Sequence, residues 1–230
     1  MKLYGMQKLT LLDYPGKIAA TLFAGGCNFR CPFCHNADLV THLDKIEPMR
    51  SEEVMAFLEK RKYTLEGICL TGGEPLLQPD VADFLAMLKA MGYSVKLDTN
   101  GSSPKKLKEI LDAGLVDYVA MDIKNSLQKY SQTIGLAIFD IGDIIESVQI
   151  LMEGAVPYEF RTTVVRELHD ESDFRAIGEW LCGARQYFLQ PFLDSPHVIC
   201  PGFHAPEPEA LDAYMAILKR TIPNVAVRGV

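Results

Sequence analysis

The sequence lacks the long apolar runs that a membrane protein or a secreted precursor needs. No stretch reaches the roughly 18 apolar residues that span a bilayer. The first ten residues mix Lys2, Gln7 and Lys8 with apolar residues. They have neither the apolar centre nor the small-residue cleavage site of a signal peptide. These absences predict a cytoplasmic protein.

The chain is also poor in cysteine and has no excess of positive charge. Six cysteines in 230 residues are too few for a disulfide scaffold. The formal net charge of -7 argues against a nucleic-acid binder, which usually has a basic face. There is no linker, low-complexity tract or clear internal repeat, and 48% of the residues are hydrophobic. We therefore expect a globular protein with a sizeable core and no nucleic-acid or membrane partner.

Short apolar runs rich in β-branched residues recur along the chain and alternate with amphipathic patterns. Near-continuous apolar runs of this kind are typical of parallel strands buried on both faces. The runs are Ile18–Ala24, Gly67–Thr71, Tyr93–Asp98, Val116–Asp122, Tyr158–Val165 and Gln186–Pro191. Helical patterns begin at Ser51, expected as an N-cap, and cover Asp80–Met91, Pro104–Ala113, Ile141–Met152, Ser172–Leu181 and Pro208–Thr221.

Alternating strands and helices predict an α/β fold built from right-handed strand–helix–strand units. Six units are too few for a complete eight-unit barrel. The pattern alone leaves a partial barrel and a doubly wound sheet open. Ligands of parallel α/β folds bind at the carboxyl ends of the strands. Small or polar residues lie at these ends, namely Cys27, Gly72, Gly73, Glu74, Thr99, Asn100, Asp122, Lys124 and Gln190.

The most specific motif is a cluster of three cysteines with the spacing Cys-x3-Cys-x2-Cys. Cys27, Cys31 and Cys34 can ligate three irons of a cubane cluster and leave the fourth iron open, whereas ferredoxins use four cysteines. A zinc site with His35 as fourth ligand is the alternative, although zinc sites usually pair two short ligand spacings. We expect Cys69 and Cys182 in the core. A second metal near Cys200 is a weaker alternative.

The cysteine spacing, with Phe33 before the third cysteine, resembles the signature of the radical S-adenosylmethionine (SAM) superfamily. Gly72-Gly73-Glu74-Pro75 resembles the superfamily motif that holds the methionine amino group of SAM. The segments His35-Asn36 and Asp122-Ile123-Lys124 resemble the enzymes that activate glycyl radical enzymes. The opening Gly5–Gly16, and the closing Pro223-Asn224-Val225 with Val227-Arg228-Gly229, are similar to the activating proteins of anaerobic ribonucleoside-triphosphate reductase.

The resemblance implies a partial (β/α)6 TIM-like barrel in a single domain of residues 1–230. Its core is expected over about 16–195, with a C-terminal helix and tail over 196–230. One 4Fe-4S cluster would reduce SAM to methionine and a 5′-deoxyadenosyl radical, which abstracts a hydrogen from a glycine of a partner glycyl radical enzyme. Residues 35–50 contain no cysteine, so the electron would come from a separate flavodoxin or ferredoxin.

The resemblance also implies roles for individual residues. Glu74 would bind the SAM ammonium, Lys124 or Arg161 the SAM carboxylate, and Gln190 the adenosine. Thr99 and Asn100 would lie near the ribose or methionine. Each has a structural alternative: Gly72–Pro75 as a turn, Asp122 and Lys124 as an ion pair, Arg161 paired with a structural carboxylate. Two other functions stay open, a small-molecule enzyme of the 7-carboxy-7-deazaguanine synthase type and a non-catalytic iron–sulfur module.

Overall fold

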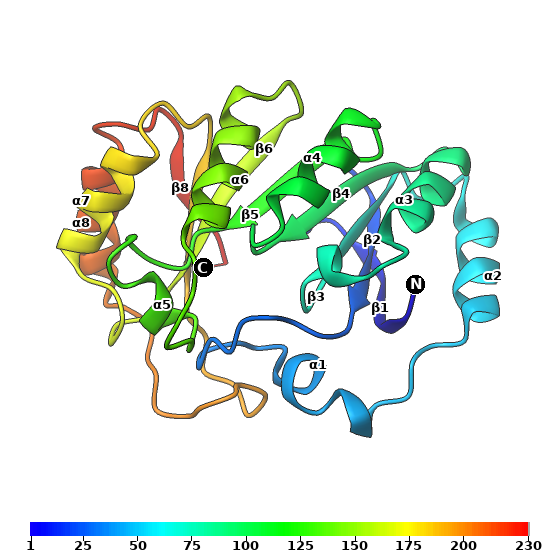
Figure 1. The fold of residues 1–230 in the computed structure, drawn as a ribbon, viewed down its shortest axis with the longest axis horizontal. Coiled ribbons are helices and arrows are strands. Elements are labelled where there is room, and N and C mark those ends of the chain that lie inside the picture. The colour runs from blue at the N-terminus through cyan, green and yellow to red at the C-terminus, as the bar shows by residue number, and fades with distance from the viewer. Residues whose placement is uncertain (230) are drawn as a thin grey trace. The chain divides into compact units, whose positions relative to one another are not determined.

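The computed structural model describes residues 1–229, in which strands and helices alternate along most of the chain (Figure 1). The chain forms two compact units. Unit 1 contains residues Met1–Asn28 and Asp38–Ala120, and unit 2 contains Phe29–Ala37 and the chain from Met121 onward. Strand β5 (Tyr118–Asp122) therefore contributes its first three residues to unit 1 and its last two to unit 2.

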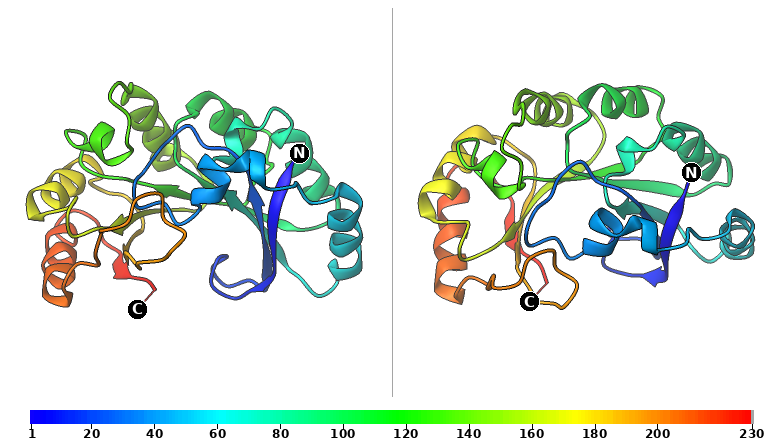
Figure 2. Two further views of the ribbon diagram at one scale, coloured as in Figure 1. Left: turned by 90° about the horizontal axis from the view of Figure 1, so that it is seen from below. Right: turned by 60° about the horizontal axis from the view of Figure 1, so that its bottom comes forward.

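Unit 1 contains four complete strands. β1 (Leu3–Thr10) runs antiparallel to β2 (Ala19–Ala24), and β3 (Gly67–Gly72) lies parallel to both β2 and β4 (Ser94–Thr99). The core strands are buried: Leu22, Leu70 and Leu97 have no exposed surface. Helices α2 (Ser51–Arg61), α3 (Val81–Ala90) and α4 (Pro104–Asp112) follow β2, β3 and β4 (Figure 2). Between β2 and α2 lie α1 (Ala37–Thr41) and the 3-10 turn η1 (Leu43–Lys45), and η2 (Pro75–Leu77) follows β3.

Unit 2 contains the parallel strands β6 (Tyr158–Val164), β7 (Tyr187–Pro191) and β8 (Val225–Val227). Its helices are α5 (Tyr130–Thr133), α6 (Gly142–Glu153), α7 (Glu171–Trp180) and α8 (Pro208–Leu218). A capping box starts α7: the Asp170 side chain accepts from the Asp173 N–H, and the Asp173 side chain accepts from the Asp170 N–H. No described helix is long and apolar enough to cross a membrane.

The six predicted strands and the main helices are confirmed to within about two residues at most ends, a normal uncertainty of helix and strand boundaries. Two strands were not predicted. β1 mixes Gln7 and Lys8 with apolar residues, and β8 has only three residues. β1 gives no continuous apolar run because its residues 7–9 are exposed, and the apolar run of β8 is too short to be distinguished from a loop. The division into a core of 16–195 and a tail of 196–230 stays a prediction.

Two local predictions were wrong. Ser51 is the first helical residue, and Arg50, in an extended conformation, is the N-cap of α2 without a side-chain bond. Cys182 is exposed, because α7 ends at Trp180 and Cys182 lies in the following turn. Cys69 is buried in β3 as predicted.

The closing segment of the chain is fixed by a buried ion pair. Arg228 donates two hydrogen bonds to the carboxylate of Glu159 on β6, at 2.6 and 3.0 Å, and Glu159 has no exposed surface. The Arg228 guanidinium also lies 3.6 Å from the ring centre of Phe188 on β7. A bidentate pair with a stacked aromatic ring uses the planar arginine fork fully. This arrangement holds β8 against β7.

Candidate active site

The three clustered cysteines lie in the loop between β2 and α1. Cys31 is buried, Cys27 and Cys34 are partly exposed, and the Cys34 N–H donates to the Cys31 carbonyl at 3.0 Å in a tight turn. Phe33 lies between the last two cysteines and is 3% exposed. Cys27 belongs to unit 1, and Cys31 and Cys34 belong to unit 2.

In unit 1, Gly72 at the end of β3 and Gly73 directly after it permit a close approach of two backbones. A Cβ atom at Gly73 would lie 2.0 Å from the Gly26 carbonyl oxygen, and one at Gly72 would lie 2.3 Å from the Ala24 carbonyl oxygen. Gly72 also has a positive φ of 117°. The Gly73 N–H donates to Ala24 and the Glu74 N–H donates to Gly26, each at 2.8 Å. The glycines therefore fix the start of the cysteine loop against the end of β3. An ordinary turn would not need so close an approach of two backbones.

Glu74 is fully buried and collects several donors on its carboxylate. Oε1 accepts from the Leu76 N–H at 3.0 Å and from the Thr99 hydroxyl at 2.8 Å. Oε2 accepts from the Asn100 N–H at 2.6 Å. Glu74 is the N-cap of η2, which Pro75 begins as expected. The structure thus brings Glu74, Thr99 and Asn100 together at the carboxyl ends of β3 and β4.

Asn100 connects this group to the cysteine loop. Its side-chain amide donates to the Asn28 amide oxygen at 2.9 Å and lies 3.7 Å from the Cys27 sulfur. Asn28 in turn donates to the Ser102 hydroxyl at 2.9 Å. Asn28 was not predicted as a functional residue. Its only sequence signal is its place beside Cys27, and its partners lie more than 70 residues away.

In unit 2, Asp122 accepts from two cations. Lys124 Nζ lies 2.9 Å from one carboxylate oxygen and Arg161 Nε lies 2.7 Å from the other. Burial opposes the charge on each partner, but the two cations hold the pKa of Asp122 well below its usual range. The pKa of Lys124 is raised by Asp122 and by the nearby thiols of Cys31 and Cys34, which outweigh its burial. Asp122 and Lys124 therefore form an ion pair, and Arg161 is paired with the Asp122 carboxylate, as the structural alternatives for these residues stated.

Two further candidate residues are His35, which lies in the cysteine loop, and Gln190, which lies in β7. His35 Nε2 lies 2.6 Å from the Leu193 carbonyl oxygen, and its ring stacks on Phe192. This contact agrees with a role in shaping the loop. Gln190 lies opposite Thr163 in the pairing of β7 with β6 and is partly buried. Its predicted contact with adenosine stays a prediction.

The donors fit an iron–sulfur cluster in their chemistry. Thiolates are the usual ligands of 4Fe-4S clusters, and this loop presents three thiols within eight residues. Over residues 1–229, no group of three or more His, Cys, Asp or Glu side chains is already gathered as a metal site. The assignment of Cys27, Cys31 and Cys34 therefore depends on donor type and spacing and stays a prediction.

Comparison with known proteins shows the family. The model of the radical SAM superfamily matches residues 21–181. A Methanocaldococcus jannaschii protein, named as a glycyl-radical enzyme activating enzyme, is 31% identical over 98% of this chain and 95% of its own length. The pyruvate formate-lyase-activating enzyme of Clostridium pasteurianum is 32% identical over 54% of this chain and 52% of its own.

A solved structure agrees with the fold. A domain of the pyruvate-formate lyase-activating enzyme from Bacteroides vulgatus superposes with a TM-score of 0.58 and 20% identity, covering 71% of this chain and 99% of that domain. The superfamily match spans parts of both compact units, so these units belong to one radical SAM domain with an α/β fold. The chain belongs to the radical SAM superfamily and, within it, is related over nearly its whole length to the glycyl-radical enzyme activating enzymes.

Proposed function

We propose that this protein installs a glycyl radical on a partner enzyme, with anaerobic ribonucleoside-triphosphate reductase as the preferred partner. The observation that carries the proposal is the similarity to a glycyl-radical enzyme activating enzyme over 98% of the chain. The choice of reductase depends on the resemblance of the opening Gly5–Gly16 and of the closing segment. A separate flavodoxin or ferredoxin would supply the electron.

Different residues would hold the cluster and SAM. Cys27, Cys31 and Cys34 would hold a 4Fe-4S cluster. Once reduced by one electron from the donor, that cluster together with SAM would supply the carbon radical that removes a hydrogen atom from the substrate glycine. The cofactors carry the difficult chemistry, and the protein binds, orients and shields them.

The buried polar groups suit SAM, which carries an ammonium, a carboxylate and a sulfonium. Glu74 is a buried anion at the carboxyl end of β3 and would accept from the SAM ammonium. The Thr99 hydroxyl and Asn100 N–H already hold its carboxylate in place. Lys124 and Arg161 are cations 15% and 14% exposed, and each could turn one donor toward the SAM carboxylate while keeping Asp122. Asp122 would then orient both cations.

The test is electron paramagnetic resonance after anaerobic incubation of the protein with SAM, a strong reductant and the candidate reductase. We expect a glycine-centred doublet on the reductase, absent without SAM. Replacement of the acceptor glycine of the reductase by alanine should remove the signal. Consumption of a small metabolite with formation of 5′-deoxyadenosine, and no radical on any glycyl radical enzyme, would replace this proposal with the small-molecule alternative.

Replacing Glu74 should weaken SAM binding. Glu74→Ala removes a charge-assisted contact worth about 1.5–3 kcal/mol, so the Kd for SAM should rise by roughly 10- to 150-fold. Isothermal titration calorimetry on the reconstituted protein measures this change.

The matched control for Glu74 is Thr99→Val, which removes one hydrogen bond to Glu74 but keeps its charge. We expect a smaller change in Kd for this variant. Equal losses in the two variants would show that Glu74 acts through the local geometry. Unchanged binding by Glu74→Ala would remove the motif from the SAM site.

A further inference from the structure

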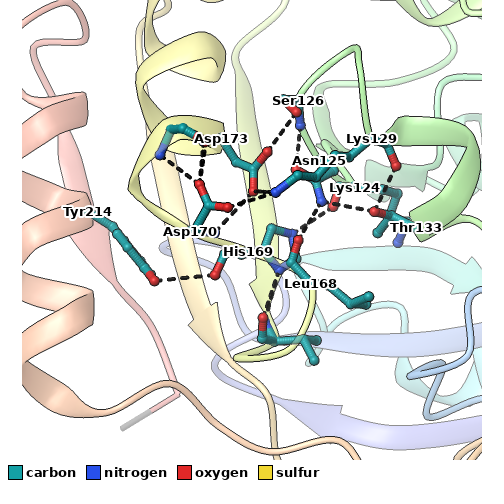
Figure 3. Close-up of polar contacts among 12 residues, drawn as sticks. Lys124, Asn125, Ser126, Lys129, Thr133, Leu168, His169, Asp170, Asp173 and Tyr214 are labelled. Atoms are coloured by element: carbon teal, nitrogen blue, oxygen red, sulfur yellow. Dashed lines mark hydrogen bonds and ion pairs between the residues drawn. The ribbon is translucent and has the colours of Figure 1, made fainter.

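A buried histidine in unit 2 holds the backbone of Lys124. His169 is 3% exposed, and its Nε2 lies 2.9 Å from the Lys124 carbonyl oxygen (Figure 3). A carbonyl only accepts, so Nε2 must carry the hydrogen. Burial lowers the pKa of His169, which keeps the ring neutral, and Nδ1 then accepts from the Val165 N–H at 3.1 Å. His169 therefore links the end of β6 to the segment just after β5.

The loop after Lys124 is held at several further points. The Asn125 amide donates to the Leu168 carbonyl and to the Thr133 hydroxyl, each at 2.9 Å. Ser126 donates to Asp173 at 2.8 Å, and Lys129 pairs with Asp170 and Asp173 (Figure 3). Asn125, Ser126 and Asp173 are buried, and a fully satisfied buried network is rigid. Lys124 thus extends from a backbone with little freedom.

The same loop contacts the cysteine loop on its other side. The Arg30 N–H donates to the Ile134 carbonyl at 2.9 Å. A Cβ at Gly135 would lie 2.3 Å from the Arg30 carbonyl oxygen, so the two backbones are in close contact. Cys31 follows Arg30 directly, so these backbone contacts hold the loop that begins at Lys124 against the segment that carries Cys31 and Cys34. Both cysteines also contribute to the raised pKa of Lys124, in agreement with this placement. Lys124 is therefore a cation held near two of the three predicted cluster ligands.

We infer that the Lys124 ammonium raises the reduction potential of the cluster held by Cys31 and Cys34, and that His169 is the positioning residue that keeps it there. A reduced cluster carries one more negative charge, and a nearby cation stabilises that state. The inference relies on the cluster of the proposed function but not on the partner. Lys124 would then ease the transfer of an electron to the cluster, in addition to any contact that it makes with SAM.

The test is the midpoint potential of the reconstituted protein, measured by a redox titration followed by electron paramagnetic resonance, with neither SAM nor partner present. Lys124→Gln should shift the potential to a more negative value. His169→Phe keeps an aromatic ring beside Phe174 but cannot donate to Lys124, and should shift the potential in the same direction by less. His169→Gln offers an amide N–H near the position of Nε2 and should restore the wild-type potential.

Two controls separate positioning from a general structural role. Tyr214 donates to the His169 carbonyl at 3.3 Å, so Tyr214→Phe disturbs the same region and should leave the potential unchanged. In the Lys124→Gln background, His169→Phe should cause no further shift, because residues that act through one another are not additive. If His169→Phe fails to fold, Asn125→Ala loosens the same loop and takes its place.

The inference is overturned if Lys124→Gln leaves the potential unchanged, or if the His169→Phe shift persists in the double variant. Iron content, measured for each variant, ensures that the clusters compared are complete. The titration involves no radical transfer. A failure of this inference therefore leaves the proposed function standing, and a failure to activate any partner leaves these potentials measurable.

Discussion

Replacing any one of Cys27, Cys31 and Cys34 by alanine should abolish the iron–sulfur cluster. Anaerobically reconstituted wild-type protein should contain about four irons and four sulfides per chain. Each variant should retain close to none, because a cubane with an open iron has no spare thiolate ligand in this loop. Iron and sulfide analysis, with the visible absorption of the cluster, measures the effect. Cleavage of SAM should be lost in parallel.

The other three cysteines provide matched controls for this prediction. Cys182 and Cys200 are exposed, and their alanine variants should bind iron normally. Cys69 is buried, with its sulfur 3.8 Å from Lys96 Nζ, so Cys69→Ala should lower stability and still bind the cluster. Loss of iron from these variants, equal to the loss from the first three, would show that the ligands are wrongly chosen.

Placing a methyl group at Gly73 should have a large effect for so small a substitution. The new Cβ of Gly73→Ala would lie 2.0 Å from the Gly26 carbonyl oxygen. A backbone atom cannot move aside as the end of a side chain can, so β3 and the start of the cysteine loop must separate. We expect a loss of about 3 kcal/mol in the free energy of unfolding of the apoprotein. Cluster binding should also fall.

Gly92→Ala is the matched control for Gly73→Ala. Gly92 has a positive φ of 91°, but a Cβ there would meet no atom within 4 Å. Its cost should be only that of the left-handed conformation, about 1–2 kcal/mol, with normal iron content. Urea unfolding compares the two variants. Equal stability losses and intact iron in both would show that the close approach of the two backbones is unimportant.

The ion pairs of Asp122 show that a sequence pattern can predict which residues belong to a site but not which of them contact one another. The sequence places Asp122 and Lys124 at the end of one strand and Arg161 within another. The structure adds that Asp122 accepts from both cations. The pairing follows from the alignment of β5 and β6, where the Ile123 N–H donates to the Arg161 carbonyl at 2.8 Å. Such an alignment is decided by packing over the whole sheet and leaves no local signal.

Glu74 and His169 illustrate the same limit. Glu74 is recognisable from the motif around it, but its bonds to Thr99 and Asn100 join residues about 25 positions apart. His169 lies in the stretch Glu167–Asp170, in which nothing indicates a link to Lys124, 45 residues earlier. A lone histidine has many structural uses, and only the folded chain shows which carbonyl it meets.

The sequence by itself determined the α/β class, the order of strands and helices, and the three cysteines that point to an iron–sulfur cluster. These features have local causes: apolar runs for buried strands, glycine and proline for the boundaries of elements, and thiol spacing within one loop. Only the tertiary structure decided that Gly73 packs on Gly26, that Asp122 joins Lys124 to Arg161, and that His169 holds Lys124. Those contacts join residues distant in the chain, and their energy depends on burial and mutual geometry, which exist only once the core has formed.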